Sequence, residues 1–434
     1  MATKKEKTGK KERKPNWQEY MATPDDIKAF IDDRMFLRYN VVTKRVEYRL
    51  LSSYEQDATE WQPINDHLVN SIWVKLSREK KVKINHIYTV IESDSVPDFH
   101  PFKDYLDRLP KWDGQDYILG MSVSVSVKGS LDKQALFAQY LKKWLVGMVA
   151  AWVDDTVVNN VILVLIGEQG SYKTTWFNYL LPPELKQYFY TKTNANRMGR
   201  DDLLTLAQYG LVCCEELDTM RPAELNQLKA AVTMPSIDER AAYAHFHEHR
   251  QHIASFCGTG NNVQFLSDPT GNRRWLPFEV ASIDSPRDHP FNYEGIYAQA
   301  YALYQQGFQY WFSRSEIQKL SEHNKAFETV DMEKELISSR FRNPGEGEKG
   351  VFMTATEILQ AISGSLSQNI SINRIGRAMT DLGYVRVRSN GDRGFRVVPY
   401  TADEIKARQR LRAIDAKPET DDDRGALGAF DTIF

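Results

Sequence analysis

The sequence has few cysteines, no long hydrophobic run and almost no net charge. Only Cys213, Cys214 and Cys257 are present, and their spacing fits neither a disulfide framework nor a metal site, which favours a reducing compartment. No apolar run approaches the roughly 18 residues that span a membrane, and no apolar segment follows the charged N-terminus as in a signal peptide. These absences predict a cytoplasmic protein without a membrane partner.

The size and charge of the chain set further bounds. With 434 residues it can hold two or three domains, and its 42% hydrophobic and 26% charged residues are ordinary for a globular protein. The net charge of −2 excludes an overall basic field, so contact with nucleic acid must come from local patches. Residues 1–14 contain seven Lys or Arg and two Glu, which predicts a disordered basic tail.

The strongest local pattern is VILVLIGEQGSYKTTWFNYLL, which begins at Val161. Its apolar, β-branched start predicts a strand buried on both faces, followed by a glycine-containing turn, Lys-Thr and an amphipathic helix. This order is that of a phosphate-binding loop, whose usual pattern is G-x-x-x-x-G-K-[ST]. Here Tyr172 replaces the glycine before Lys173, and Gly170 lies inside the loop.

We expect this loop to bind the phosphates of ATP. Glycines let backbone N–H groups turn towards an anion, Lys173 can reach the β- and γ-phosphates, and Thr174 can hold Mg²⁺. The alternative is an ordinary glycine turn between a strand and a helix. The residues of the expected binding loop are Gly167, Glu168, Gln169, Gly170, Ser171, Tyr172, Lys173, Thr174 and Thr175.

A second pattern, Leu211-Val-Cys-Cys-Glu-Glu-Leu-Asp, predicts a short apolar strand that ends in Glu215 and Glu216, with Asp218 following. In a doubly wound sheet, acidic residues at the carboxyl end of a strand face the ligand crevice. One carboxylate, assigned to Glu215, can hold Mg²⁺, and the other can orient or deprotonate the attacking water. The alternative is a solvated acidic turn.

Two further patterns follow in the chain. Residues 253–262 predict another strand that ends in Thr259 and Asn261, where a polar side chain can position water. The alternative there is a common Gly-Asn turn. Arg273 and Arg274 lie on a later turn and suit the role of an arginine finger, although surface arginines more simply form ion pairs.

In this order and spacing, the four patterns resemble the virulence-associated protein E family, which belongs with the superfamily 3-like helicases of phages, plasmids and mobile elements. That family's loop has a glycine at the place of Gly170 and none before the lysine, so Tyr172 fits the resemblance. The resemblance covers roughly residues 98–280. The matching pieces are Gly167-Glu-Gln-Gly-Ser-Tyr-Lys-Thr-Thr, Glu215-Glu-Leu-Asp, Gly258-Thr-Gly-Asn, Asp268-Pro-Thr-Gly-Asn-Arg-Arg-Trp, Phe99-His-Pro-Phe-Lys-Asp-Tyr-Leu-Asp-Arg-Leu and Lys111-Trp-Asp-Gly.

The resemblance implies an α/β fold with a P-loop, AAA+-like, parallel-sheet ATPase core. It implies that Glu215 and Glu216 share metal and water duties and that Asn261 senses the γ-phosphate. It also implies that Arg273 or Arg274 is an arginine finger supplied in trans. A finger in trans requires a homo-oligomeric ring, which in this family is usually a hexamer.

The resemblance further implies a DNA-gripping hairpin between the acidic strand and the Asn261 strand. The candidates for DNA contact there are Arg240, His245, His247 and Arg250. Histidines at alternating positions can also suggest a metal site, but no cysteine or acidic partner stands at metal-binding spacing.

The N-terminal region, residues 24–130, mixes helices and short strands and includes a hairpin formed by residues 36–42 and 45–50. Residues 122–130, rich in Ser, Val and Gly, are expected to form a surface loop. We find no primase site before residue 98, so a separate primase becomes a candidate partner. This region is expected to be an α+β accessory domain.

The C-terminal region predicts two helices, at residues 354–362 and 371–383, and a hairpin at residues 385–398. This arrangement is typical of a winged helix, in which Arg374 and Arg377 are candidates for DNA contact. Winged helices also serve as protein-docking modules. The expected domains are a basic tail (1–23), an accessory domain (24–130), the ATPase (131–340), a winged helix (350–400) and a flexible tail (401–434).

These expectations describe an ATP-dependent DNA helicase or translocase that acts on single-stranded or forked DNA in the replication of a mobile element. The alternative is an ATP-switched assembly, phage-defence or regulatory protein that binds DNA or a partner without unwinding. A third possibility is a DNA-binding regulator with a degenerate ATPase site. DNA-stimulated ATP hydrolysis distinguishes the motor from the other two.

Overall fold

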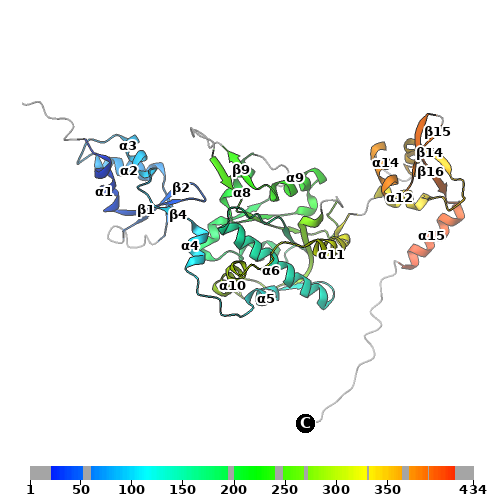
Figure 1. The fold of residues 1–434 in the computed structure, drawn as a ribbon, viewed down its shortest axis with the longest axis horizontal. Helices are drawn as coiled ribbons and strands as arrows, with labels where there is room; N and C mark the ends of the chain where they lie inside the picture. The colour runs from blue at the N-terminus through cyan, green and yellow to red at the C-terminus, as the bar shows by residue number, and fades with distance from the viewer. Residues whose placement is uncertain are drawn as a thin grey trace, which may run out of the picture. The chain divides into compact units, whose positions relative to one another are not determined.

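The computed structural model describes residues 21–51, 60–193, 200–239, 248–267, 272–329, 332–363, 371–389 and 391–415. The chain divides into two compact units, Met1–Glu328 and Thr329–Phe434 (Figure 1). The first unit contains a small N-terminal sheet and a six-stranded sheet, and the second has a small sheet of its own. No helix within the described ranges is long and apolar enough to cross a membrane.

The N-terminal part of the first unit packs helices on one face of a sheet with the order β3-β2-β1-β4. Strands β1 and β2 are antiparallel and form the predicted hairpin, with Lys44 in the left-handed region at its turn. The elements are α1 (Pro24–Asp32), β1 (Met35–Asn40), β2 (Arg45–Leu50), β3 (Gln62–Pro63), α2 (Asp66–Leu76), α3 (Ile84–Ile91) and β4 (Asp98–Phe99).

The large sheet has the strand order β5-β12-β6-β11-β8-β7. Strand β5 is antiparallel to β12, and all other neighbours are parallel. Strands β6, β8 and β11 are buried throughout, because parallel inner strands are covered on both faces. The predicted α/β class with a parallel sheet is therefore confirmed. The strands are β5 (Val125–Val127), β6 (Ile162–Ile166), β7 (Phe189–Lys192), β8 (Leu211–Cys214), β11 (Ser255–Gly260) and β12 (Trp275–Ile283).

Helix α6 is the long helix that packs on this sheet. The indole N–H groups of Trp144 and Trp152 donate to the carbonyl oxygens of Phe256 at 3.0 Å and Gly210 at 3.2 Å. These bonds join α6 to β11 and to the residue that precedes β8, the neighbouring strand. The helices are α4 (Pro101–Asp107), α5 (Tyr117–Ser122), α6 (Leu131–Val153), α7 (Lys173–Asn178), η1 (Pro183–Tyr188), α8 (Arg200–Gln208), η2 (Leu217–Thr219), α9 (Pro222–Val232), η3 (Asn272–Arg274), α10 (Tyr293–Gln305), α11 (Arg314–Asn324) and η4 (Lys325–Phe327).

Residues 101–130, which the sequence groups with the accessory domain, pack in the hydrophobic core of the large sheet. Phe102 of α4 stacks on Trp152 with ring centroids 4.6 Å apart. The stretch expected as a surface loop contains β5, whose Val125 pairs with Ile283 of β12. Its alternation of buried Val and exposed Ser is a strand pattern, but three residues are too few to identify it from sequence.

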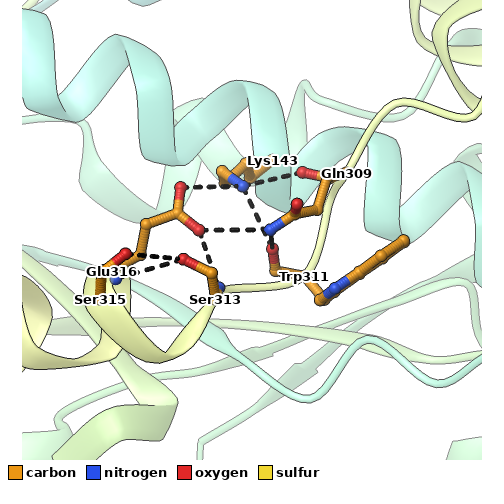
Figure 2. A network of polar contacts seen from close by, with 6 residues as sticks. All are labelled: Lys143, Gln309, Trp311, Ser313, Ser315 and Glu316. Carbon is orange, nitrogen blue, oxygen red and sulfur yellow. Dashed lines mark hydrogen bonds and ion pairs between the residues drawn. The ribbon is translucent and has the colours of Figure 1, made fainter.

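Buried Lys143 on α6 holds the segment that leads into α11 (Figure 2). Its Nζ lies 3.1 Å from Glu316 Oε1 and donates to the carbonyl oxygens of Gln309 and Trp311. Burial acts to raise the pKa of Glu316, but hydrogen bonds from Ser313 and Lys143 outweigh it and leave that pKa below its ordinary value. Because both charges are satisfied, this network anchors α11 to α6.

The second unit contains the predicted helices and hairpin. Helices α13 and α14 pack together, and β15 pairs antiparallel with β16. Residues expected as a flexible tail include helix α15, whose first turn is capped by Thr401 and Glu404. Helix α15 could not be predicted from sequence, because its strongly charged residues form no apolar face. The elements are α12 (Met332–Arg340), β13 (Phe341–Arg342), β14 (Val351–Thr354), α13 (Ala355–Ser363), α14 (Ile372–Asp381), β15 (Arg386–Ser389), β16 (Asp392–Pro399) and α15 (Ala402–Asp415).

Candidate nucleotide-binding site

The glycine loop leaves the carboxyl end of β6 and returns into α7. Gly167 is buried, its N–H donates to the carbonyl of Gly260 in β11, and a Cβ placed on it would lie 2.8 Å from Val280 Cγ2. Gly170 has a φ of +84°, which favours glycine. Both glycines are therefore required by the path of the loop between its neighbouring strands.

Tyr172 occupies the position that a glycine holds in the usual pattern. Its φ is 61°, so it adopts the left-handed conformation that a glycine would adopt more easily. Its side chain is 47% exposed, so packing does not account for this conformation. Among the described non-glycine residues, only Lys44, Tyr172 and Glu216 have positive φ, and two of these belong to the candidate site. Such strain is often found at functional sites.

Lys173 is largely buried at the first position of α7, and its ammonium group lies inside the loop. Its Nζ donates to the carbonyl oxygens of Gly167 at 2.8 Å and Glu168 at 2.6 Å and lies 3.2 Å from Ser171 Oγ. Burial lowers the pKa of Lys173, while the nearby carboxylate of Asp218 acts in the opposite direction. The loop thus surrounds a cation that suits an anionic ligand.

Glu215 and Glu216, the predicted acidic pair, follow β8 directly. The N–H of Glu215 donates to the carbonyl of Lys192, and its side chain is half-buried. Glu216 is exposed and has a φ of 54°, so the chain turns sharply there. This turn brings Asp218, rather than Glu216, back towards the loop.

Asp218 is the residue that sequence reasoning noted but did not include in the site. Its Oδ2 accepts the N–H of Asn262 at 3.0 Å, and a Cβ on Gly260 would lie 3.0 Å from Oδ1. Oδ1 is buried and has no hydrogen-bond partner among the described residues. A buried carboxylate oxygen without a partner, close to Lys173, marks a place where a ligand or water can bind. The sequence feature that could have identified Asp218 is that it is the third acidic residue after β8.

Asn261 follows β11, the strand between β6 and β8. Its side chain is exposed, and its Oδ1 lies 3.4 Å from Lys173 Nζ. Because parallel strands end at one edge of the sheet, the glycine loop, the acidic turn and Asn261 come together there. Buried Thr259 lies within β11 itself.

Arg273 and Arg274 lie at the opposite edge. They directly precede β12, whose first residue Trp275 is in register with Ile162, the first residue of β6. The length of β6 places them about 16 Å or more from Gly167. Arg273 is exposed and Arg274 half-buried. The two arginines therefore do not join the loop of their own chain.

The segment between the acidic turn and β11 contains an antiparallel pair, β9 (Ser236–Glu239) and β10 (Glu248–Gln251), as predicted for a hairpin. Arg250 lies on β10 in register with Ile237. His249 Nδ1 is 2.7 Å from Asp238 Oδ1. The other predicted DNA contacts, Arg240, His245 and His247, lie outside the described residues.

In the second unit, Arg374 and Arg377 both lie on α14 and are exposed. Arg374 forms an ion pair with Glu333 of α12 at 2.9 Å, and Glu333 is buried. This pairing gives Arg374 a structural partner. Arg377 forms no ion pair with the described residues and remains a candidate for phosphate contact.

The described residues hold no group of three or more His, Cys, Asp or Glu side chains arranged for a metal. Thr174 follows Lys173 in α7, and Glu215 and Asp218 belong to the acidic turn after β8. Mg²⁺ is commonly held by one or two carboxylates together with substrate phosphates and water. The residues present fit that mode of binding and not a site built from protein ligands alone.

These features define a mixed α/β protein whose parallel sheet carries a lysine-containing glycine loop at its carboxyl edge. The sequence model of the virulence-associated protein E-like domain matches residues 106–329, more than half of the chain. The chain therefore belongs to the virulence-associated protein E-like family. The resemblance inferred from the four patterns is confirmed.

Solved structures similar to this chain include three apo structures of the NrS-1 C-terminal region. The first is 13% identical, covers 86% of this chain and 98% of its own, and has a TM-score of 0.46. The other two are 13% and 12% identical with the same coverage and a TM-score of 0.43 each. No curated protein matches the chain.

Proposed function

We propose that this chain is an ATP-dependent DNA helicase or translocase that acts as a homo-oligomeric ring, with six subunits as the expected number, in the replication of a phage, plasmid or other mobile element. The observation that carries the proposal is the meeting of three groups at one edge of the parallel sheet. Lys173 lies inside the glycine loop, Asn261 Oδ1 lies 3.4 Å from its Nζ, and Asp218 accepts the N–H of Asn262, the residue after Asn261. This combination suits binding and cleavage of a nucleoside triphosphate.

In this proposal the P-loop, residues 167–175, binds the triphosphate of ATP. Lys173 stabilises charge on the β- and γ-phosphates, and Asn261 contacts the γ-phosphate. Glu215, Glu216 and Asp218 supply the carboxylates that orient or deprotonate the attacking water. Because Asp218 has the buried oxygen without a partner, we assign it a larger share of this work than exposed Glu216.

Thr174 and Glu215 are the residues that would hold Mg²⁺. When bound, the ion neutralises charge on the phosphates. Thr174 lies directly after Lys173 in α7. The glycine loop orients Thr174, and the end of β8 orients Glu215.

The finger arginine is proposed to come from a neighbouring copy, because Arg273 and Arg274 lie at the opposite edge of their own sheet. The β9–β10 hairpin, with Arg240, His245, His247 and Arg250, is proposed to contact DNA, single-stranded or forked. The second unit is proposed to be a winged helix that contacts DNA through α14. A separate primase is a proposed partner.

Hydrolysis of ATP by purified protein, with and without single-stranded DNA, tests this function. We expect DNA to stimulate hydrolysis and Lys173→Ala to reduce it by at least about a hundredfold. Lys142→Ala is the matched control, because Lys142 pairs with Asp116 on the surface of α5 and α6. Hydrolysis that survives Lys173→Ala would contradict the assignment of the loop.

The second candidate function is an ATP-switched assembly or regulatory protein. It is favoured by the ion pair between Arg374 and Glu333, which gives a predicted DNA contact a structural role. Such a protein would hydrolyse ATP at a rate indifferent to DNA. The same assay therefore separates the two functions, since only the motor couples hydrolysis to DNA.

A further inference from the structure

One face of the N-terminal sheet has no part in the proposed ATPase site. Along β1, the side chains of Met35, Leu37 and Tyr39 contribute to the hydrophobic core formed with α1, α2 and α3. Side chains alternate along a strand, so Phe36 and Arg38 lie on the other face. Among the described residues, the core with α1, α2 and α3 lies on the first face, whereas the second face is exposed at Phe36 and buried at Asn40 and Glu47.

Aromatic rings and guanidinium groups alternate across this second face. Phe36 lies opposite Arg49 in the β1–β2 register, and the Arg49 guanidinium is 5.4 Å from the Phe36 ring and 5.1 Å from the Trp61 ring. The Arg38 guanidinium is 4.1 Å from the Trp61 ring and 3.5 Å from the Phe99 ring. We call this row the aromatic–arginine ladder: Phe36, Arg49, Trp61, Arg38 and Phe99.

The charge on this face is positive. The only acidic residue of β1 and β2 is Glu47, which is buried. It is neutralised by Arg38 at 2.7 Å and accepts a hydrogen bond from Asn40. Arg49 and exposed Arg45 add positive charge without an acidic neighbour on these strands. An anionic partner is therefore favoured.

The ladder is accessible at one end and along its edges. Phe36 is 50% exposed, and Arg49, Trp61 and Phe99 are half-buried, whereas the Arg38 side chain is only 17% exposed and paired with Glu47. Phe36 is exposed and does not belong to the hydrophobic core formed with α1, α2 and α3. Cation–π contacts from Arg38 and Arg49 hold the Trp61 ring in place, and the Phe36 ring is the most exposed ring of the ladder.

We propose that the aromatic–arginine ladder binds single-stranded nucleic acid, with bases stacking on its rings and phosphates contacting its arginines. Single strands present both a π-face and a negative backbone, which this alternation matches. A duplex hides its base faces and matches only the charge. Asn40, at the end of β1, donates to the hydroxyl of Tyr188 just before β7, so the ladder is joined to the edge strand of the large sheet. A nucleic-acid single strand bound to the ladder is therefore held beside the proposed ATPase core.

Binding of a fluorescent oligothymidylate of about 12 nucleotides to the full chain without ATP tests this proposal. The variant Phe36→Ala/Trp61→Ala is expected to bind it at least about tenfold more weakly than wild type. Binding of a duplex of equal length is expected to be unchanged. Trp311→Ala is the control, because Trp311 is 57% exposed and lies far along the chain, before α11.

A second measurement uses wild-type protein, so its result does not depend on whether the double variant folds. An oligonucleotide that contains 5-iododeoxyuridine is crosslinked by light to wild-type protein, and the attached peptides are mapped. We expect crosslinks at Phe36, Trp61 or Phe99. Crosslinks confined to other regions, or unchanged affinity of the variant, would overturn the proposal.

Two other outcomes would also overturn it. An equal loss of duplex binding would mean that the face recognises phosphates and not bases. Competition by polyglutamate as strong as that by the oligonucleotide would mean that the partner is an acidic protein. The assay contains no ATP, so failure of the proposed ATPase function leaves this result unaffected.

Discussion

The two edges of the large parallel sheet carry different chemistry. At the carboxyl edge, Lys173, Asp218 and Asn261 gather around the glycine loop. At the amino edge, Arg273 and Arg274 precede β12, about 16 Å away along the strand direction. Parallel strands create this inequality because all of their carboxyl ends lie together.

The carboxyl edge brings a lysine, an asparagine and a carboxylate together, whereas the two arginines lie at the amino edge. The amino edge is held in place by buried Asn324 of α11, which donates to the carbonyl oxygens of Asn272 and Trp275. The start of α11 is in turn anchored by the Lys143 network (Figure 2). Arg273 and Arg274 therefore lie on a turn that Asn324 holds in place, too far from the glycine loop of their own chain to contact a nucleotide bound there.

The largest expected effect is on ATP hydrolysis, in variants that remove either the arginines of the amino edge or the lysine of the carboxyl edge. Arg273→Ala or Arg274→Ala is expected to lower ATP hydrolysis by about a thousandfold. Mixing that inactive variant with Lys173→Ala is expected to restore part of the activity, because some interfaces then pair an intact loop with an intact arginine. Hydrolysis by each variant alone and by mixtures measures this.

Arg314→Ala is the matched control, because Arg314 is exposed at the start of α11 and far from η3 along that helix. Light scattering checks that the variants form the same oligomer. If mixtures stay as inactive as their components, the arginines do not act in trans. If both arginine variants hydrolyse ATP normally, the amino edge has no part in the reaction.

The strand, turn and helix around the glycine loop could be predicted from sequence, whereas the distance of the arginines from the loop could not, and the reason is physical. The loop is a local pattern, in which Gly167, Gly170 and Lys173 follow a buried strand, and local patterns are visible in sequence. The distance of Arg273 from the loop depends on the register of β12 with β6, which is a long-range property. The hairpin of β1 and β2 was equally local and was confirmed.

The acidic turn shows the same limit on a smaller scale. The sequence places Glu215, Glu216 and Asp218 within four positions, and any of them can be expected to face the ligand. Which one does so depends on the backbone at Glu216, whose φ of 54° redirects the chain. Left-handed backbone at a non-glycine residue is not a feature that composition or periodicity reveals.

The next largest effect compares two carboxylates of this turn. Asp218→Asn is expected to lower ATP hydrolysis by about a hundredfold, because its buried oxygen has no partner among the described residues. Glu216→Gln is expected to have a smaller effect, since that side chain is exposed. Steady-state hydrolysis at saturating ATP and Mg²⁺ gives the comparison. The reverse order of effects would return the larger share of the work to Glu216.

The smallest expected effect concerns backbone strain, which among the described residues of this sheet is found at the carboxyl edge, at Tyr172 and Glu216. Tyr172→Gly relieves a left-handed conformation that costs about 1–3 kcal/mol, and the greater freedom of glycine in the unfolded chain offsets about 0.4–1 kcal/mol. We therefore expect a net stabilisation of about 1 kcal/mol in urea unfolding. Tyr172→Ala removes the same exposed ring but keeps the strain, so it should not stabilise. Equal stability of the two variants would mean that the ring, and not the backbone, determines the effect, and the contrast in strain between the two edges would be lost.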